Sequence, residues 1–337
     1  MKIIITGGAG FIGSALVRHL IEKTDHHILN IDKLTYAANL DSLSSISKNK
    51  RYTFFHEDIL NHEAISKIFN EYKPQAVFHL AAESHVDKSI TDPISFIKTN
   101  VTGTANLLDT ANRYWKNLSS TDQQKFRFHH ISTDEVYGDL EDGNFFTELT
   151  PYDPSSPYSA SKAASDHLVR AWHRTYKLPI IITNCSNNYG PFQFPEKLIP
   201  LTIIKVMRGE KIPVYGNGLQ VRDWLHVEDH VDALYEVISN GTIGQTYNIG
   251  GNNEKTNIDV IHIICDLLDK KKSYPINGQS SRELIEFTKD RPGHDIRYAI
   301  DASKIKKDLN WQPKRTFEEG IKETVDWYVK NYKNKEI

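Results

Sequence analysis

The sequence predicts an α/β fold built on a doubly wound parallel sheet, with a smaller, irregular α/β lobe that binds substrate. Two observations predict the sheet: short β-branched apolar runs alternate with longer amphipathic patterns, and a glycine-rich turn follows the first run directly. Strands buried on both faces have such continuous apolar runs, and the helices between them form right-handed crossovers. A third observation, frequent Pro, Gly and Asn after about Ser186, predicts the smaller lobe.

The regular elements are expected where these patterns lie. Strands are predicted at Lys2–Thr6, His27–Ile31, Tyr52–His56, Ala76–Leu80, Phe126–Ile131 and Pro179–Thr183. Helices are predicted at Phe11–Glu22, Ala64–Tyr72, Ile94–Trp115, Tyr158–Tyr176, Glu196–Arg208, Val227–Ser239, Asn257–Asp269 and Thr316–Lys330. We therefore expect a dinucleotide-binding domain over 1–185 and a substrate-binding domain over 186–337, with segments near 218–245 as candidates to cross back to the first.

Composition excludes several classes of protein. The 337 residues are 39% hydrophobic and 25% charged, with a formal net charge of −2. This balance argues against general nucleic-acid binding, and no apolar run is long enough for a membrane span. Cys185 and Cys265 lie in apolar surroundings without metal-site spacing, so we expect reduced core cysteines, no metal and a cytoplasmic protein. The first apolar run is also too short for a signal peptide.

The glycine-rich turn predicts a dinucleotide site. Gly7, Gly10 and Gly13 are spaced G-x-x-G-x-x-G between the first predicted strand and the first predicted helix. Glycines here permit a tight turn, a close approach of the backbone to a pyrophosphate, and packing of helix on strand. The helix N-terminus then offers unpaired N–H groups and its positive dipole end to the anion. The predicted sheet is therefore of the Rossmann type.

Acidic residues at the next two strand ends point to NAD. Asp32, at the end of the second predicted strand, is placed to accept a hydrogen bond from the ribose 2′-hydroxyl. Its charge would repel the 2′-phosphate of NADP, although the adjacent Lys33 weakens this argument. Asp58 has two interpretations of equal weight: it binds the adenine amino group, or it caps the helix that begins near Asn61.

Tyr158 and Lys162 form the first candidate catalytic pair. They lie four residues apart at the start of a predicted helix, so they share one face of it. A phenol titrates near ~10, and lowering its pKa by about three units requires roughly 4 kcal/mol. One ammonium at about 4 Å supplies approximately this amount at an effective dielectric constant of about 20. We therefore expect Lys162 to make Tyr158 a base that takes a proton from a sugar hydroxyl.

Asp134 and Glu135 form the second candidate pair, directly after the fifth predicted strand. Ser132 and Glu135 also fit a capping box, which is the ordinary interpretation of this sequence. The position, however, is the carboxyl end of a central strand, where α/β folds bind their ligands. Adjacent strand residues point to opposite faces, so both acids reach one substrate only if the chain turns here, and the nearby Gly138 permits that. Two carboxyls with separated pKa values suit an elimination, with Glu135 as base and Asp134 as acid.

These motifs together resemble the extended short-chain dehydrogenase/reductase family. The likeness extends nearly over the whole chain, through Thr6–Gly13, Asp32–Ala37, His79–Asp87, Ser132–Gly138, Tyr158–Lys162, Asn187–Pro191, Arg222–His230 and Asp290–Asp295. Within that family the chain resembles the dTDP-glucose 4,6-dehydratases. The discriminating feature is the acid pair Asp134–Glu135, because epimerases of the same superfamily usually lack it.

The resemblance implies a hydro-lyase with tightly bound, recycled NAD+ that acts on dTDP-glucose. The sugar would be oxidised at C4, lose water across C5–C6 and regain hydride at C6, giving dTDP-4-dehydro-6-deoxy-D-glucose for dTDP-rhamnose, O-antigen or related deoxysugar biosynthesis. Family members also form homodimers, here through helices at Ile94–Trp115 and Tyr158–Tyr176. A UDP- or CDP-glucose 4,6-dehydratase stays open, as does a non-catalytic NAD-sensing regulator on the same fold.

The resemblance also implies three sets of site residues. The catalytic set is Thr133, Asp134, Glu135, Tyr158 and Lys162. The NAD set is Gly7, Gly10, Phe11, Ile12, Gly13, Asp32, Lys33, Leu34, Thr35, Asp58, Ile59, Leu80, Ala81, Ala82, Ser84, Thr99, Tyr158, Lys162 and Asn188. The substrate set is Ser84, Asp87, Thr133, Asn187, Lys197, Leu198, Pro213, Val214, Tyr215, Arg222, Asn257, Asp290, Arg291 and His294.

Two further positions bear on these sets. Arg222 and Arg291 lie in loop-like stretches, and arginine suits a diphosphate because it binds phosphate in a bidentate way. Ala38 stands where the family pattern usually has glycine, and alanine costs free energy there if the backbone needs a positive φ.

Overall fold

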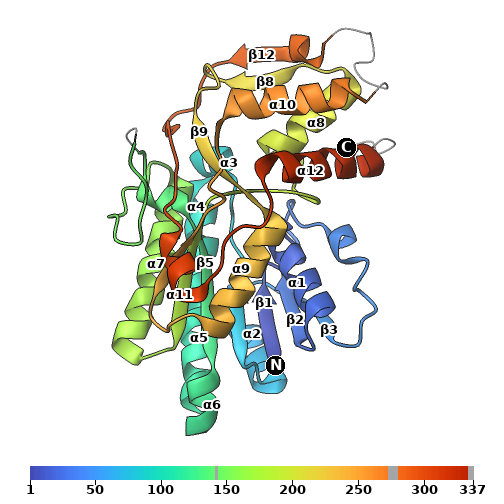
Figure 1. The fold of residues 1–337 in the computed structure, drawn as a ribbon. Coiled ribbons are helices and arrows are strands. Elements are labelled where there is room, and N and C mark those ends of the chain that lie inside the picture. Colours follow the sequence, from blue (N-terminus) through green and yellow to red (C-terminus); the bar gives the residue numbers. More distant parts are fainter. Residues whose placement is uncertain (141–142, 272–279, 333–337) are drawn as a thin grey trace.

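A seven-stranded parallel sheet forms the centre of the computed structural model, which describes residues 1–140, 143–271 and 280–332 (Figure 1). The strand order is β10-β6-β5-β4-β1-β2-β3. The strands are β1 (Lys2–Thr6), β2 (His27–Asp32), β3 (Tyr52–His56), β4 (Ala76–His79), β5 (Arg127–Thr133), β6 (Ile180–Cys185) and β10 (Thr246–Ile249). The predicted doubly wound sheet is confirmed, and its order reverses between β1 and β4, where such folds bind ligands.

Helices cover both faces of this sheet. One face carries α1 (Phe11–Lys23) and α9 (Val227–Asn240), and the other carries α2 (His62–Tyr72), α5 (Thr104–Lys116) and α7 (Pro157–Tyr176). Because successive strand residues point to opposite faces, β1 contributes to two cores. Ile3 and Ile5 pack in the first core, whereas Ile4 packs in the second.

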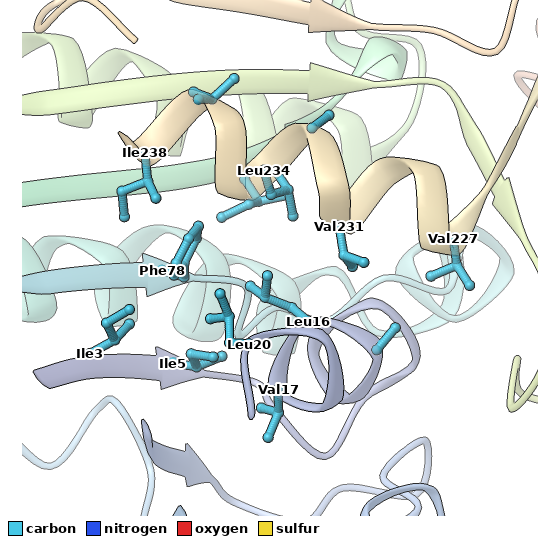
Figure 2. Close-up of a cluster of buried hydrophobic side chains, with 14 of the residues drawn as sticks. Ile3, Ile5, Leu16, Val17, Leu20, Phe78, Val227, Val231, Leu234 and Ile238 are labelled. Atoms are coloured by element: carbon cyan, nitrogen blue, oxygen red, sulfur yellow. The ribbon is translucent and has the colours of Figure 1, made fainter. Parts of the chain in front are cut away.

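Helix α9 comes from the second half of the sequence and closes the first core. Val227, Val231, Leu234 and Ile238 recur at helical spacing and are all buried. Figure 2 shows these side chains directed toward α1 and the strands. The chain then enters β10, which pairs in parallel with β6, and α11 (Ser303–Leu309) later packs against β10 and α9. The second half of the chain therefore completes the large sheet.

The predicted helix Ile94–Trp115 is interrupted in its middle. It begins as α4 (Pro93–Phe96), widens into a π-helix over Ile97–Gly103, and continues as α5. A π turn adds a residue per turn and often lies at a functional site. Here it brings Thr99 to the main cavity and buries Asn100, whose amide bonds to the Glu83 carbonyl and the Ser161 hydroxyl. Sequence periodicity did not reveal this widening.

A separate apolar core forms the smaller lobe, seen above the sheet in Figure 1. Its helices are α8 (Leu198–Arg208), α10 (Asn257–Asp269) and α12 (Phe317–Tyr332), and its strands are β7 (Asn187–Tyr189), β8 (Ile212–Tyr215), β9 (Val221–His226), β11 (Glu254–Thr256) and β12 (Ile285–Thr288). Short helices α3 (Val86–Thr91) and α6 (Ser120–Lys125) flank the large sheet. Within the described ranges, no helix combines the length and apolarity needed to cross a bilayer.

Replacing Leu234 by alanine tests the contribution of α9. Leu234 is completely buried between α9, α1 and the sheet. We expect Leu234→Ala to lower the free energy of unfolding by about 2–5 kcal/mol, because it removes buried methyl groups and leaves a cavity. Chemical denaturation measures this change. The matched control is Leu219→Ala, since Leu219 is 56% exposed; equal effects of the two substitutions would contradict the packing described here.

Candidate active site

The chain turns sharply where β5 ends. Asp134 and Glu135 begin a 3-10 turn, Asp134–Tyr137, and the hydroxyl of Thr133 caps it by accepting from the Glu135 N–H at 3.3 Å. The capping-box interpretation is wrong, because the Ser132 hydroxyl donates to Asp166 instead. Gly138 follows with a φ of 89°, and a Cβ there would lie 2.2 Å from the Asp153 carbonyl oxygen. The turn lets both acids line one cavity.

Helix α7 presents the Tyr–Lys pair to the same cavity. Ser156 and Ser159 form a capping box, and Pro157 occupies the first turn, so the helix starts just before Tyr158. Tyr158 and Lys162 are 8% and 5% exposed, and both line the cavity. The Lys162 ammonium donates to the Ile131 carbonyl oxygen of β5 at 2.8 Å. This hydrogen bond ties the helix to the strand that carries the acids.

The electrostatics of the two acids differ. Burial, and then the charge of Glu135, raise the pKa of Asp134 well above its ordinary value. Its Oδ2 atom is buried and has no hydrogen-bond partner among the described residues. Burial also raises the pKa of Glu135, but the positive charges of Arg291, Lys197 and Arg222 oppose this. Asp134 is therefore suited to donate a proton and Glu135 to accept one.

Without bound NAD, the pKa of Tyr158 is raised, whereas its spacing from Lys162 predicted a lowered value. Burial, followed by the charges of Glu135, Cys185 and Asp134, raises the pKa of Tyr158 well above its ordinary value. A hydrogen bond with Thr133 opposes this shift. Burial lowers the pKa of Lys162, and the charge of Asp166 opposes that change. A phenolate at Tyr158 thus requires positive charge beyond that of Lys162.

The glycine-rich turn forms one end of the cavity. Gly7 has a φ of 75°, and a Cβ on Gly13 would lie 2.1 Å from the Gly7 carbonyl oxygen, so the turn requires both glycines. Gly10 is the N-cap of α1 and supplies no side-chain cap, while Phe11 and Ile12 line the cavity. The unpaired N–H groups of this first turn fit an anionic group such as a pyrophosphate.

Asp32 and Lys33 shape the ribose side of the cavity. Asp32 accepts from the Ala9 N–H at 2.9 Å and from the Leu34 N–H at 2.8 Å, leaving lone pairs toward the cavity that it lines. The Lys33 ammonium lies 3.8 Å from Asp58 and 3.5 Å from Glu83. Since two carboxylates already hold Lys33, it offers little to a 2′-phosphate, and the site favours NAD over NADP.

The loops after β3 and after β2 each decide a point that the sequence left open. Asp58 does not cap α2, because the side chain of Asn61 performs that role by accepting from the Ala64 N–H at 3.2 Å. Ala38 is not among the described residues with positive φ, so its methyl group causes no backbone strain. The left-handed residue of the loop after β2 is Leu34, with a φ of 54°.

Most of the expected NAD set meets in this cavity. The members that line it are Gly7, Gly10, Phe11, Ile12, Gly13, Asp32, Lys33, Thr35, Asp58, Ile59, Leu80, Ala81, Ala82, Ser84, Thr99, Tyr158, Lys162 and Asn188. Leu34 does not line it and packs against the core instead. All five expected catalytic residues line it, and so do Asn187 and Lys197 from the substrate set.

The rest of the substrate set lies outside the cavity lining: Asp87, Leu198, Pro213, Val214, Tyr215, Arg222, Asn257, Asp290, Arg291 and His294. Val214 is buried in the core of the smaller lobe, and Leu198 packs against that core. Asp87 joins the two lobes, because it accepts from the Tyr215 hydroxyl at 3.1 Å and lies 3.5 Å from Arg291.

Arg222 and Arg291 differ in their surroundings. Arg222 is buried, donates to the Asp295 carbonyl oxygen at 2.9 Å and lies over the Tyr298 ring. The Nε of Arg291 has no hydrogen-bond partner among the described residues. Arg291 therefore keeps a donor for an anion, whereas backbone carbonyls already hold part of the Arg222 guanidinium.

Sequence reasoning missed several residues that line the cavity: Ala37, Glu57, Ile131, Ser132, Cys185, Ser186, Gln193, Phe194 and Glu196. Glu196 connects the lobes, since its carboxylate accepts from the Tyr36 hydroxyl at 3.2 Å and lies 3.3 Å from His85. Ile131 ends a predicted strand, Ser132 follows it directly, and Cys185 lies two residues after another, so strand ends could have signalled these three. Glu196 is brought in by tertiary contacts between distant loops.

The fold and cavity define a class of enzyme. A glycine-rich turn at the switch point of a parallel sheet, with a Tyr–Lys pair and two acids in one cavity, is typical of dehydrogenase/reductase-type enzymes that act on nucleotide sugars. A model of the family described as GDP-mannose 4,6 dehydratase matches residues 4–324, and the chain belongs to that family.

Individual relatives are more specific. A dTDP-glucose 4,6-dehydratase of Shigella flexneri is 59% identical over 344 residues, which cover 98% of this chain and 93% of that protein. Among solved structures, the dTDP-glucose 4,6-dehydratase of Bacillus anthracis, in complex with NAD, is 45% identical with a TM-score of 0.88 and covers 99% of this chain and 98% of its own. DesIV, a dTDP-glucose 4,6-dehydratase of Streptomyces venezuelae also solved with NAD bound, is 40% identical with a TM-score of 0.90, and 98% of each chain is covered. The resemblance expected from the motifs is confirmed.

Two alanine substitutions separate folding of the glycine turn from its binding role. Gly13→Ala places a Cβ 2.1 Å from the Gly7 carbonyl oxygen, so we expect a loss of roughly 1–3 kcal/mol of stability. Gly10 has a φ of −76°, and its added Cβ meets only the Gly7 carbonyl oxygen at 3.3 Å. Gly10→Ala should therefore keep the native stability but bind NAD more weakly. Thermal unfolding of cofactor-free protein and NAD titration measure the two effects. Undiminished NAD affinity in Gly10→Ala would contradict this placement.

Proposed function

We propose that the protein is a dTDP-glucose 4,6-dehydratase with recycled NAD. It converts dTDP-glucose to dTDP-4-dehydro-6-deoxy-D-glucose by elimination of one water. The observation that carries the proposal is the acid pair: Asp134 and Glu135 share a cavity with Tyr158 and Lys162, and their electrostatics suit one proton donor and one acceptor. Relatives of that activity are 59% identical over nearly the whole chain.

Tyr158 and Thr133 act on the 4-hydroxyl group of the glucose. Thr133 hydrogen-bonds this hydroxyl, and Tyr158 takes its proton. Bound NAD accepts the hydride of C4, returns it later to C6, and adds through its oxidised nicotinamide the positive charge that ionisation of Tyr158 requires. Lys162 contributes its ammonium from the adjacent turn of the helix.

Glu135 and Asp134 carry out the elimination. Oxidation at C4 makes the C5 proton acidic, because the new ketone stabilises the carbanion, and Glu135 removes this proton. Asp134, kept protonated by burial and by its neighbour, donates to the departing C6 hydroxyl. The C5–H and C6–O bonds break, one water molecule forms, and a C5=C6 double bond is left. Return of hydride to C6 and of the proton from Glu135 to C5 gives the product, and only this return leaves the NAD unchanged over the cycle.

The smaller lobe binds the nucleotide diphosphate in this proposal. Arg291 supplies a free donor, Lys197 lines the cavity, and Arg222 adds charge near Glu135. Contacts to the rest of the nucleotide are assigned to Asp87, Asn187, Leu198, Pro213, Val214, Tyr215, Asn257, Asp290 and His294. Residues 1–185 hold NAD, and 186–337 hold the nucleotide sugar, apart from the segments that return to the large sheet.

The protein acts as a homodimer in the cytoplasm under the same proposal. Ile94 and Ile97 are 60% and 44% exposed at the start of the segment expected to form the interface with α7, and Ile90, just before it, is 40% exposed. Both cysteines are free and buried, which is consistent with a reducing compartment. The product would enter dTDP-rhamnose synthesis, for O-antigen, or a related deoxysugar route.

A substrate panel tests the reaction and the nucleotide together. We expect dTDP-glucose to lose one water and to form the 4-keto product without net NADH, whereas UDP-, CDP- and GDP-sugars react more slowly. Product mass and nicotinamide absorbance are the measurements. Faster loss of water from UDP- or CDP-glucose than from dTDP-glucose would show that the nucleotide assignment is wrong. Absence of dehydration with every sugar nucleotide would refute the proposed activity and favour an NAD-sensing regulator.

Amide substitutions of the two acids separate the elimination into its proton transfers. Glu135→Gln should stop exchange of the C5 proton with deuterated solvent, because it removes the base. Asp134→Asn should retain oxidation at C4 and slow product formation by about 10²–10⁴-fold, because it removes the acid. Rapid mixing with detection of transient NADH, combined with mass analysis, distinguishes these outcomes.

The pH profile of the native protein follows from the same pair. Glu135 must be ionised and its pKa is raised, so the rate should fall as pH drops through a value above that of an ordinary glutamate. Glu135→Gln should lack this acid limb in its residual activity. If Glu135→Gln exchanges the C5 proton normally, the assignment of the base is wrong.

A further inference from the structure

Asp166 holds a fully buried carboxylate directly beneath the catalytic groups. It lies one helical turn after Lys162 in α7, and its side chain is 0% exposed. Its Oδ2 accepts from the Ser132 hydroxyl at 2.9 Å and from the Tyr152 hydroxyl at 2.8 Å, and its Oδ1 lies 3.1 Å from His130 Nε2. Neither the cavity lining nor the reaction steps above include Asp166.

Two hydrogen-bond partners of Asp166, Ser132 and Asn184, also contact the end of β5 that carries the catalytic residues. Ser132 directly precedes Thr133 in the strand. The Asn184 amide of β6 donates to the Thr133 carbonyl oxygen at 3.0 Å and lies 3.4 Å from Asp166 Oδ2. Asp166 is therefore connected to the Ser132–Thr133 end of β5 through two side chains, Ser132 on β5 and Asn184 on β6.

Two neighbouring groups, His130 and Lys162, favour the ionised form of Asp166. Burial alone would raise the pKa of Asp166, but the hydrogen bond and the charge of His130, followed by the charge of Lys162 and the hydrogen bond from Ser132, outweigh it and hold this pKa below its ordinary value. Burial lowers the pKa of His130 to about 4, so this imidazole is neutral at neutral pH. Arg170 reaches Asp166 only through the Tyr152 hydroxyl, to which it donates at 2.7 Å.

The other neighbours add no compensating charge. The ring centroid of His79, on β4, lies 5.2 Å from that of His130, and burial lowers the pKa of His79 as well. Tyr137 and Tyr152 are neutral, since burial raises their pKa values. For Lys162, Asp166 is the foremost charge that opposes the effect of burial.

We propose that Asp166 is a positioning residue for the dehydration: its buried negative charge sustains the Lys162 ammonium beside Tyr158, and its hydrogen bonds hold the Ser132–Thr133 end of β5 in register with α7. The inference rests on the proposed function and adds to it one buried charged residue that contacts the catalytic segment from outside the cavity. A purely structural carboxylate would contribute to stability and leave the titration of the reaction unchanged.

Replacing Asp166 by asparagine removes the charge at nearly constant volume. Without it, the Lys162 ammonium loses its proton at lower pH, because the foremost charge that opposes the effect of burial is gone. We expect Asp166→Asn to move the alkaline limb of the kcat profile to lower pH by about one unit or more. KM for dTDP-glucose should change little, since Asp166 does not line the cavity. The measurement is NADH formation from dTDP-glucose in a single turnover across the pH range.

Three further variants separate charge, tether and stability. Ser132→Ala keeps the charge and removes one tether, so it should lower kcat at every pH without moving the limb. Asp166→Glu restores the charge, so the alkaline limb of its kcat profile should return to the pH of the native protein. The matched control is Asp229→Asn: Asp229 is 2% exposed and pairs with Arg315 at 2.7 Å in the α9 region, so this variant should lose stability and keep the native profile.

The outcomes decide between the alternatives. Asp166→Asn with a native pH profile, or with a rate loss that merely follows the unfolded fraction, overturns the inference. If Asp166→Asn does not fold, Ser132→Ala decides, and unchanged kcat in a folded Ser132→Ala overturns the proposed tether. Failure of the native protein to convert dTDP-glucose would refute the proposed function instead, so the two failures are distinguishable.

Discussion

Parallel strands place all their carboxyl ends at one edge of the sheet, and the whole candidate site depends on this constraint. The glycine turn follows β1, Asp32 ends β2, and Thr133 ends β5, so groups more than a hundred residues apart along the chain line one cavity. The reversal of strand order between β1 and β4 keeps crossovers from covering this edge. Helix α7 then adds Tyr158 and Lys162 from one face of the sheet.

Burial is the second constraint, because it acts on the four ionisable groups of the catalytic set. It raises the pKa values of Asp134, Glu135 and Tyr158 and lowers that of Lys162. Charged neighbours then shift the pKa of each group further, and they differ between Asp134 and Glu135, so one of these adjacent acids is suited to donate a proton and the other to accept one. A low-dielectric environment also strengthens each charge interaction, so the charged residue beneath the site, Asp166, affects Lys162 although it does not line the cavity.

Local sequence predicted most of the fold and much of the site, since both follow from periodicity and from strand ends. The six predicted strands fell within two residues of their predicted bounds, because continuous β-branched runs and the turns that end them are local features, whereas β7 to β12 were not predicted. The π-helix at Ile97–Gly103 was missed, because its residues keep a helical pattern. Likewise Glu196 was missed, because its partners Tyr36 and His85 lie on loops far from it in sequence.

By itself, the sequence determined the doubly wound sheet, the glycine turn, the Tyr–Lys spacing and the acid pair, because each is a pattern of neighbouring residues with a fixed backbone geometry. Tertiary structure alone decided which charges face one another. It paired Lys33 with Asp58 and Glu83, which favours NAD, and it left Tyr158 with a raised pKa where local spacing had suggested a lowered one. The physical reason is that desolvation and charge interactions depend on distances in space, and several distant segments set those distances together.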